Sequence, residues 1–239
     1  MTRFTPLALT LGVLLASTSA HAANNVQVNQ IGEGELILVN QADQGSATAT
    51  ITQSGQRNRV QVDQTDTLHN PPTYRNQAVI VQEGHDNKIN NGLLLPAVRP
   101  GQNNTVAGGA LNQINLKQDG FNNGIGYSQS GQGHKVVLVQ GGNDNSARLM
   151  QSGSFGQIYA TQRGSGNFMT FEQSGNFDLS GGVQEGIDNR MTVSQTGDGE
   201  FGNVQQSGQG NTVLALQSGP SAFAQVTQGG TGNFIQIVH

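Results

Sequence analysis

The sequence contains no cysteine and no tryptophan, has only 6 Pro among its 239 residues, and is only 11% charged. Without cysteine there can be no disulfide, so stability must come from backbone pairing and packing. Disordered chains are usually rich in charge and proline, and this chain is poor in both. With 34% hydrophobic and 5% aromatic residues, it also has too little apolar material for one thick globular core.

What the chain does contain is neutral, polar and rich in glycine. It has 34 Gly, 29 Gln and 24 Asn. The formal net charge is -4, and the 11 Lys and Arg are scattered singly. They form no basic surface, so we expect no nucleic-acid partner.

The first 22 residues have the features of an export signal. Arg3 supplies the positive start, an apolar run extends from Leu7 to Ala16, and residues 20–22 read Ala-His-Ala, an A-x-A cleavage site. About ten apolar residues are too few to span a bilayer, and no later stretch approaches the roughly 20 that are needed. We therefore expect residues 1–22 to be a signal peptide and the mature chain, which begins near Ala23, to be secreted without a transmembrane segment.

Glutamine recurs every 11 residues through the second half of the sequence, and each of these units is called an arc below. Two residues after each glutamine stands a glycine, and five residues after every second glutamine stands an asparagine. The period is therefore 22 residues, or two arcs. The glutamines are Gln118, Gln129, Gln140, Gln151, Gln162, Gln173, Gln184, Gln195, Gln206, Gln217 and Gln228. The asparagines are Asn123, Asn145, Asn167, Asn189, Asn211 and Asn233. The glycines are Gly120, Gly131, Gly142, Gly153, Gly164, Gly175, Gly186, Gly197, Gly208, Gly219 and Gly230. In the other arcs the asparagine position carries His134, Gly156, Asp178, Glu200 and Ala222.

Within an arc, aliphatic and polar residues alternate between the asparagine position and the next glutamine. Val136 and Leu138 would point inward, while Lys135 would point outward. Period-two alternation indicates strands with one buried face. The glycine at a fixed offset predicts a tight turn with a positive φ or a close approach of backbones. We therefore predict an all-β fold, a two-sheet β-solenoid of seven-residue strands and four-residue turns.

The pattern divides the chain after residue 22 into two segments. Residues 118–239 are predicted to be regular repeats, and residues 23–117 to be irregular repeats of the same kind. Two inserts interrupt the irregular segment, at residues 65–75, which contain Asn-Pro-Pro, and at residues 93–100. Proline cannot donate to a strand ladder, so we expect both inserts to be loops on the flank of the solenoid. The total is about 19 strands.

The repeated amides are predicted to be inward and structural. A narrow interior leaves buried polar groups unpaired unless they bond to one another. Glutamines and asparagines at fixed corners could align from coil to coil, each side chain donating to the next and accepting from the previous one. Such ladders continue to the two ends of the stack, where an uncapped coil would be a template for another chain.

The units also carry a family resemblance. Residues 162–167 read Gln-Arg-Gly-Ser-Gly-Asn with Gln173 following, and residues 206–211 read Gln-Ser-Gly-Gln-Gly-Asn with Gln217 following. These units resemble curlin repeats, which build the curli fibre subunits of Gram-negative bacteria. The match is strict from Gln118 to the end and looser over residues 24–118.

The resemblance implies a secreted amyloid subunit that forms surface fibres, or fimbriae, for biofilm matrix and adhesion. It implies as partners other copies of the chain, a related curli subunit and an outer-membrane export pore. The curli family contains a major fibre subunit and a surface-bound nucleator, and this sequence differs from both. It has more arcs than either, and its last arc lacks the basic residues of a membrane-held nucleator. Both roles stay open.

Two other classes of function are weighed against the fibre. A surface-binding solenoid of the adhesin or ice-binding type would present a flat outward column of threonine, whereas the outward positions here mix Lys135, Arg148 and Phe234. A β-helix enzyme acting on polysaccharide would need clustered acids, whereas the 15 acidic residues are spread along the chain. We therefore expect no enzyme, no catalytic residue and no cofactor.

Smaller motifs are assigned to the repeat. Gly-x-Gly fragments such as residues 131–133 recur with the turn and precede no helix, so they do not indicate a phosphate loop. Asp144 lies between two asparagines as in a calcium loop, but the 11-residue period is not that of calcium-binding β-rolls. The histidines never fall at metal-ligand spacing, so no metal site is expected. The outward aromatics are lateral contacts between fibres, adhesive patches or ordinary single exposed residues, and they are Phe168, Phe201, Phe223 and Phe234.

Overall fold

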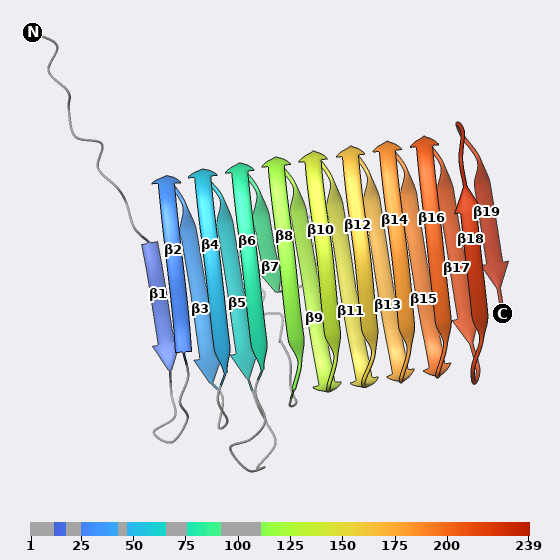
Figure 1. The fold of residues 1–239 in the computed structure, drawn as a ribbon, viewed down its shortest axis with the longest axis horizontal. Coiled ribbons are helices and arrows are strands. Elements are labelled where there is room, and N and C mark those ends of the chain that lie inside the picture. Colours follow the sequence, from blue (N-terminus) through green and yellow to red (C-terminus); the bar gives the residue numbers. More distant parts are fainter. Residues whose placement is uncertain (1–11, 18–24, 43–46, 66–75, 92–110) are drawn as a thin grey trace, which may run out of the picture.

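The computed structural model describes residues 12–17, 25–42, 47–65, 76–91 and 111–239. In these ranges the chain is an all-β solenoid of two parallel sheets, which confirms the predicted fold class. Consecutive strands alternate between the sheets, so two strands make one coil (Figure 1). The coils follow one another in sequence order from one end of the stack to the other.

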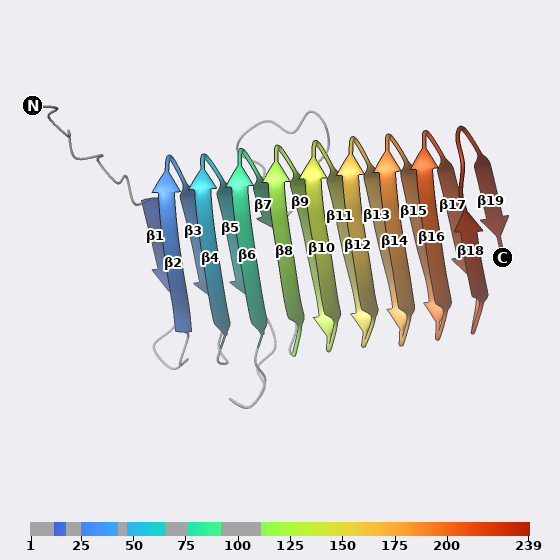
Figure 2. The ribbon, with the colours of Figure 1, turned by 45° about the horizontal axis from the view of Figure 1, so that its top comes forward.

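One sheet has ten strands and the other has nine. The ten-stranded sheet contains, in spatial order, β1 (Gly12–Ser17), β3 (Leu36–Ala42), β5 (Arg59–Thr65), β7 (Lys88–Asn91), β9 (Gly124–Gln132), β11 (Ser146–Ser154), β13 (Phe168–Asn176), β15 (Arg190–Asp198), β17 (Thr212–Ser218) and β19 (Phe234–Val238). The nine-stranded sheet contains β2 (Asn25–Glu33), β4 (Thr48–Gln56), β6 (Gln77–His85), β8 (Gln113–Phe121), β10 (Lys135–Asn143), β12 (Gln157–Ser165), β14 (Leu179–Ile187), β16 (Phe201–Gln209) and β18 (Phe223–Gln228). Figure 2 shows the nine-stranded sheet as a layer in front of the ten-stranded one.

The register between strands follows the sequence repeat. Gln140 of β10 pairs with Gln162 of β12, so neighbouring strands of a sheet are 22 residues apart in the regular segment. The loop inserts do not shift this register, because Gln82 of β6 pairs with Gln118 of β8 across the second insert. The predicted boundary between residues 117 and 118 falls inside β8, and both segments belong to one stack.

The strands are longer, and the turns shorter, than the sequence predicts. Most strands have nine residues instead of seven, as in β10 and β11, and only Asp144 and Asn145 separate these two. The predicted turn glycines from Gly120 to Gly208 therefore lie in the strands, whereas Gly219 and Gly230 lie outside them. The reason is that parallel pairing continues through the glycine, and Gly142 pairs directly with Gly164.

Strand β7, at Lys88–Asn91, lies between the two predicted inserts and pairs with β5 and β9. The described ranges contain 19 strands, and because β1 lies inside the predicted signal peptide, 18 of them follow residue 22, against the expected total of about 19. Residues 93–100 and all but the first residue of the 65–75 insert lie outside the described residues.

Strand β1 is part of the stack in this chain. Its six residues pair in parallel with β3, from Gly12 opposite Leu36 to Ser17 opposite Gln41. The first residues of the predicted export signal lie outside the described ranges. The segment predicted to be removed therefore occupies the outer edge of β3 in the uncleaved chain.

The interior is a narrow column of aliphatic side chains between the two sheets. Val136, Leu138 and Leu149 are almost fully buried, as the alternation predicts. Side-chain size is matched across the interior, because a Cβ on Gly182 would overlap the ring of Phe171 in the facing sheet. Among the described residues there is no helix that is long and apolar enough to cross a membrane.

Candidate functional site

The predicted glutamines form two buried columns that run along the stack. In the first glutamine column, on the nine-stranded sheet, the side-chain Nε2 of Gln140 donates to Gln162 Oε1 at 2.7 Å. Gln162 Nε2 donates in turn to Gln184 Oε1 at 2.8 Å. The same bond links every consecutive pair from Gln53 to Gln228 in this column.

The second glutamine column lies on the ten-stranded sheet and has one gap. Bonds of 2.7 to 3.2 Å join consecutive members from Gln129 to Gln217. Gln129 Oε1 is buried and has no partner. Strand β7 ends at Asn91, which pairs with Tyr127, two residues before the position that would face Gln129.

The column glutamines also join the two sheets. Gln140 Nε2 donates to the carbonyl of Gly124 in the opposite sheet at 3.2 Å.

The asparagine column holds the turns that precede β9 to β19 on the ten-stranded sheet. Asn145 Oδ1 accepts from the backbone N–H of Asn167 at 3.0 Å. Asn145 Nδ2 donates to the carbonyl of Gly141 at 3.1 Å and to that of Gly164 at 2.9 Å. The equivalent backbone bond is repeated through the predicted asparagines and continues before them to Asn87 and Asn58; the predicted members are Asn123, Asn145, Asn167, Asn189, Asn211 and Asn233. Each asparagine thus closes its own turn and fixes the next coil.

The turn glycines are required by close approach of the coils. Gly142 has φ of 106°, and a Cβ there would overlap the carbonyl oxygen of Gly164. Gly141 beside it has an outward position with nothing within 4 Å. Both sequence-based reasons for glycine, positive φ and backbone contact, therefore apply at Gly142.

The opposite corner contains a mixed column of different side chains. Its described members lie just before the strands of the nine-stranded sheet, and they are Ala47, Asn76, Asn112, His134, Gly156, Asp178, Glu200 and Ala222. His134 is 1% exposed, its Nδ1 accepts from Gly156 N–H at 3.2 Å, and its Nε2 lies 3.1 Å from Ser130 O. Burial lowers the pKa of His134, although backbone hydrogen bonds oppose the shift. The histidine thus replaces an asparagine as a neutral corner residue.

The residue just before each corner also has an unusual backbone, which was not predicted from the sequence. This residue has a left-handed backbone, with φ of 55° at Asp144 and 59° at Phe155. The signal is present, because Gly, Asn or Asp fills the position in many arcs, and these residues tolerate positive φ. Phe155 and Phe177 are exceptions, and their rings stack at 5.3 Å between centroids on the rim of the solenoid.

The outer faces of the described strands carry aromatic contacts. Phe201 and Phe223 stack at 5.1 Å, and Arg190 lies 4.9 Å from the ring centroid of Phe168. Phe234 is 63% exposed on the terminal strand. The predicted outward aromatics are therefore partly in ladders along the stack and partly open.

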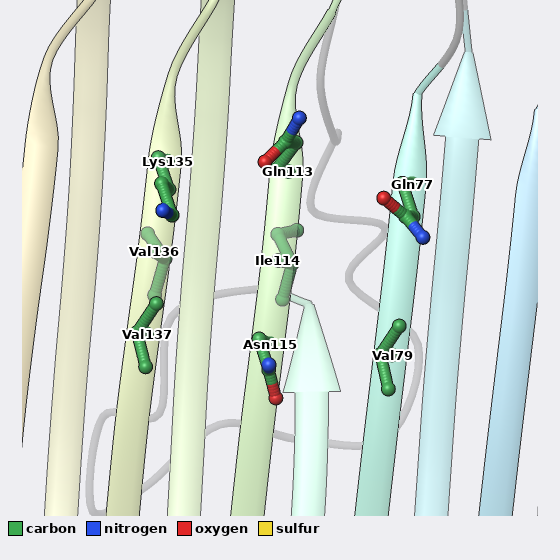
Figure 3. A pocket seen from close by; sticks show the side chains of 8 residues that line it. All are labelled: Gln77, Val79, Gln113, Ile114, Asn115, Lys135, Val136 and Val137. Atoms are coloured by element: carbon green, nitrogen blue, oxygen red, sulfur yellow. The ribbon is translucent and has the colours of Figure 1, made fainter.

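A depression of about 300 Å³ lies on the nine-stranded sheet, and Figure 3 shows the side chains that line it. Outward side chains of β6, β8 and β10 line it, including Gln77, Gln113 and Lys135, and it brings together no pair of ionisable residues. Within the described residues, no three His, Cys, Asp or Glu are grouped to hold a metal ion. The carboxylate of Asp144 instead accepts a hydrogen bond from Asn122 Nδ2 at 2.6 Å.

Comparison with known proteins adds no identification. No protein-family model matches the sequence, and no curated protein is significantly similar to it. The columns themselves are therefore the basis for any functional statement.

Proposed function

We propose that this protein is a secreted structural subunit that assembles end to end into fibres of the curli type. The observation that carries the proposal is the first glutamine column, which continues in one register from Gln53 to Gln228. Each coil presents to the next coil the same donors and acceptors that it receives from the previous one. A structure of this kind can be extended by another chain without any new type of contact.

The two ends of the described stack are suited to each other. Strand β2 pairs only with β4, and strand β18 only with β16, among the described residues. Gln30 Oε1 in β2 is buried without a hydrogen-bond partner. If a second copy continues the register, Gln228 Nε2 of the first copy faces this acceptor. Val26, Val28, Ile235 and Ile237 are only partly buried at these ends and would be covered by the same joint.

The predicted signal peptide fits this proposal. Strand β1 covers the edge of β3, which is where the β19 strand of another copy would be added. Cleavage near Ala23 would remove β1 and free both edges at that end. Export of the chain, an outer-membrane pore, a related curli subunit as partner and a fibre at the cell surface follow from the curlin resemblance and belong to the proposal.

Polymerisation of the purified chain tests the proposal. Residues 23–239 at micromolar concentration should form fibres without any cofactor, followed by amyloid-dye fluorescence and by fibre diffraction with a reflection near the roughly 4.8 Å strand spacing. A chain that stays monomeric under these conditions would contradict the proposal and favour a surface-binding solenoid. Hydrolysis of polysaccharide by the monomer would instead favour the enzyme.

A further inference from the structure

Two carboxylic acids follow one another in the mixed column. Asp178 lies just before β14 and Glu200 just before β16, one coil further along, and each is 1% exposed. Three of their four carboxyl oxygens have no hydrogen-bond partner, namely Asp178 Oδ2, Glu200 Oε1 and Glu200 Oε2. Buried polar atoms are nearly always paired, so these three require an explanation.

The asparagine column shows what a corner residue normally does. Asn189 Oδ1 accepts from the N–H of Asn211 at 3.0 Å. Its Nδ2 donates to the carbonyls of Glu185 at 3.1 Å and Gly208 at 2.8 Å. One atom of the side chain is therefore an acceptor for the next coil, and the other must be a donor to carbonyl oxygens.

Asp178 has the acceptor but lacks the donor. Its Oδ1 accepts from the N–H of Glu200 at 3.1 Å, as an asparagine would. Its Oδ2 lies 3.1 Å from the Cβ position of Gly175, and Asn189 Nδ2 lies 3.0 Å from the same position on Gly186. The second oxygen thus occupies the place of the amide nitrogen. An ionised oxygen there would face carbonyl oxygens, whereas a protonated one would donate to them.

No positive charge compensates the pair. None of the ion pairs between described residues includes Asp178 or Glu200. Burial raises the pKa of Asp178 and the charge of nearby Asp198 adds to the rise, although the hydrogen bond from the backbone of Glu200 opposes it. Burial also raises the pKa of Glu200, and the charges of Asp178 and Asp198 add to the rise, although a backbone contact at Thr196 opposes it. The other ionisable member of the column is His134, separated from Asp178 by the coil of Gly156.

From this geometry we infer that Asp178 and Glu200 form a proton-binding pair, which holds at least one proton in the folded solenoid and makes folding dependent on acidity. The proton on Asp178 Oδ2 comes from solvent and donates to the carbonyl of Ser174, four residues earlier, as Asn189 donates to Glu185. The carboxyl then acts as the missing amide. The inference concerns the coil itself and goes beyond the fibre proposal.

The sign of the pH effect follows from proton counting. The folded state binds more protons than the unfolded state at pH values above the ordinary pKa of about 4. The stability due to the pair is therefore full below about pH 4 and is lost as pH rises through the folded-state pKa. Between the ordinary pKa and the folded-state pKa, the unfolding equilibrium constant rises about tenfold per pH unit for each proton released.

The test compares the full chain with variants over pH 4 to 8. Urea unfolding is followed by circular dichroism at a concentration where light scattering stays at baseline. The double variant Asp178→Asn with Glu200→Gln supplies the donors permanently, so its advantage in urea midpoint over the natural chain should grow as pH rises. Asp119→Asn, an exposed acid in β8, is the matched control, and its difference from the natural chain should not change with pH. Taking differences removes the opposing contribution of His134, which is common to all these chains.

Two further variants keep the result decisive. Asn189→Asp puts the same carboxyl into a regular corner and should create a new loss of stability with rising pH. Asp178→Asn alone should remove most of the effect if the proton resides there. A double variant whose advantage is constant across the range would overturn the inference. A rise in urea midpoint on adding Ca²⁺ at pH 7, absent from the double variant, would identify a cation site and would also overturn it.

Discussion

Replacement of a single column glutamine gives the sharpest test of the amide ladder. Gln206 and Gln205 are neighbours in β16, but Gln206 is 2% exposed and Gln205 points outward. Gln206 accepts from Gln184 Nε2 at 2.8 Å and donates to Gln228 Oε1 at 2.9 Å. After Gln206→Ala, Gln184 Nε2 keeps its bond to the carbonyl of Phe168 at 3.2 Å, whereas Gln228 Oε1 loses its donor.

The expected cost can be worked from these contacts. One orphaned buried acceptor costs about 1 to 3 kcal/mol. The lost methylene adds about 1 kcal/mol. Gln206→Ala should therefore lower the free energy of unfolding by about 2 to 4 kcal/mol. Gln205→Ala removes an exposed side chain and should change it by less than about 0.5 kcal/mol.

Urea unfolding of the monomer, followed by circular dichroism, measures both values. Gln206→Met keeps the side-chain volume but not the amide, so it separates the hydrogen bonds from the cavity. We expect Gln206→Met to retain most of the loss. Equal destabilisation by the two alanine variants, or a fully stable Gln206→Met, would refute the ladder as a source of stability.

Three other predictions use matched changes. Gly142→Ala should destabilise the fold by at least about 2 kcal/mol in the same unfolding assay, because the new Cβ would overlap the backbone of Gly164 at a residue with positive φ. Gly141→Ala should be nearly neutral, and similar losses in the two variants would contradict the close-approach argument. Gly182→Ala should lower the free energy of unfolding by about 1 to 3 kcal/mol, because the new methyl group overpacks against Phe171. Adding Phe171→Leu to the same chain should recover part of this loss, and no recovery would show that the size match is not the cause. The chain of residues 23–239 should assemble with a shorter lag in dye fluorescence than the full chain, in which β1 covers β3, and equal lags would show that β1 does not block extension.

Periodicity alone was enough to predict the sheets and the columns. An 11-residue unit with alternating strands fixes which side chains share a face, so Gln140 and Gln162 had to stack once the coils were parallel. The carbonyl partners were not predictable in the same way. Gln140 also bonds to Gly124 in the opposite sheet, and that contact depends on the distance between the sheets.

The turns were less predictable because their backbone is set by the coil-to-coil contact. The sequence placed Gly142 in a turn, yet parallel pairing carries the strand through it to Asn143. The left-handed residue is Asp144, and its equivalent in the next arc is Phe155, a side chain for which positive φ is unusual. At Phe155 the contacts between coils therefore outweigh the residue's own preference for a negative φ.

The coils are alike in backbone and different in side chains, and the side-chain differences determine which coil pairs with which. A solenoid of identical coils could slip by one repeat at little cost, since every backbone bond would form again. Here a slip would move Phe171 away from the space beside Gly182. It would also separate His134 Nδ1 from the N–H of Gly156, and Asp178 Oδ1 from the N–H of Glu200. The amide columns thus give the stack its capacity for extension, whereas the irregular interior and the mixed column hold each chain in one register.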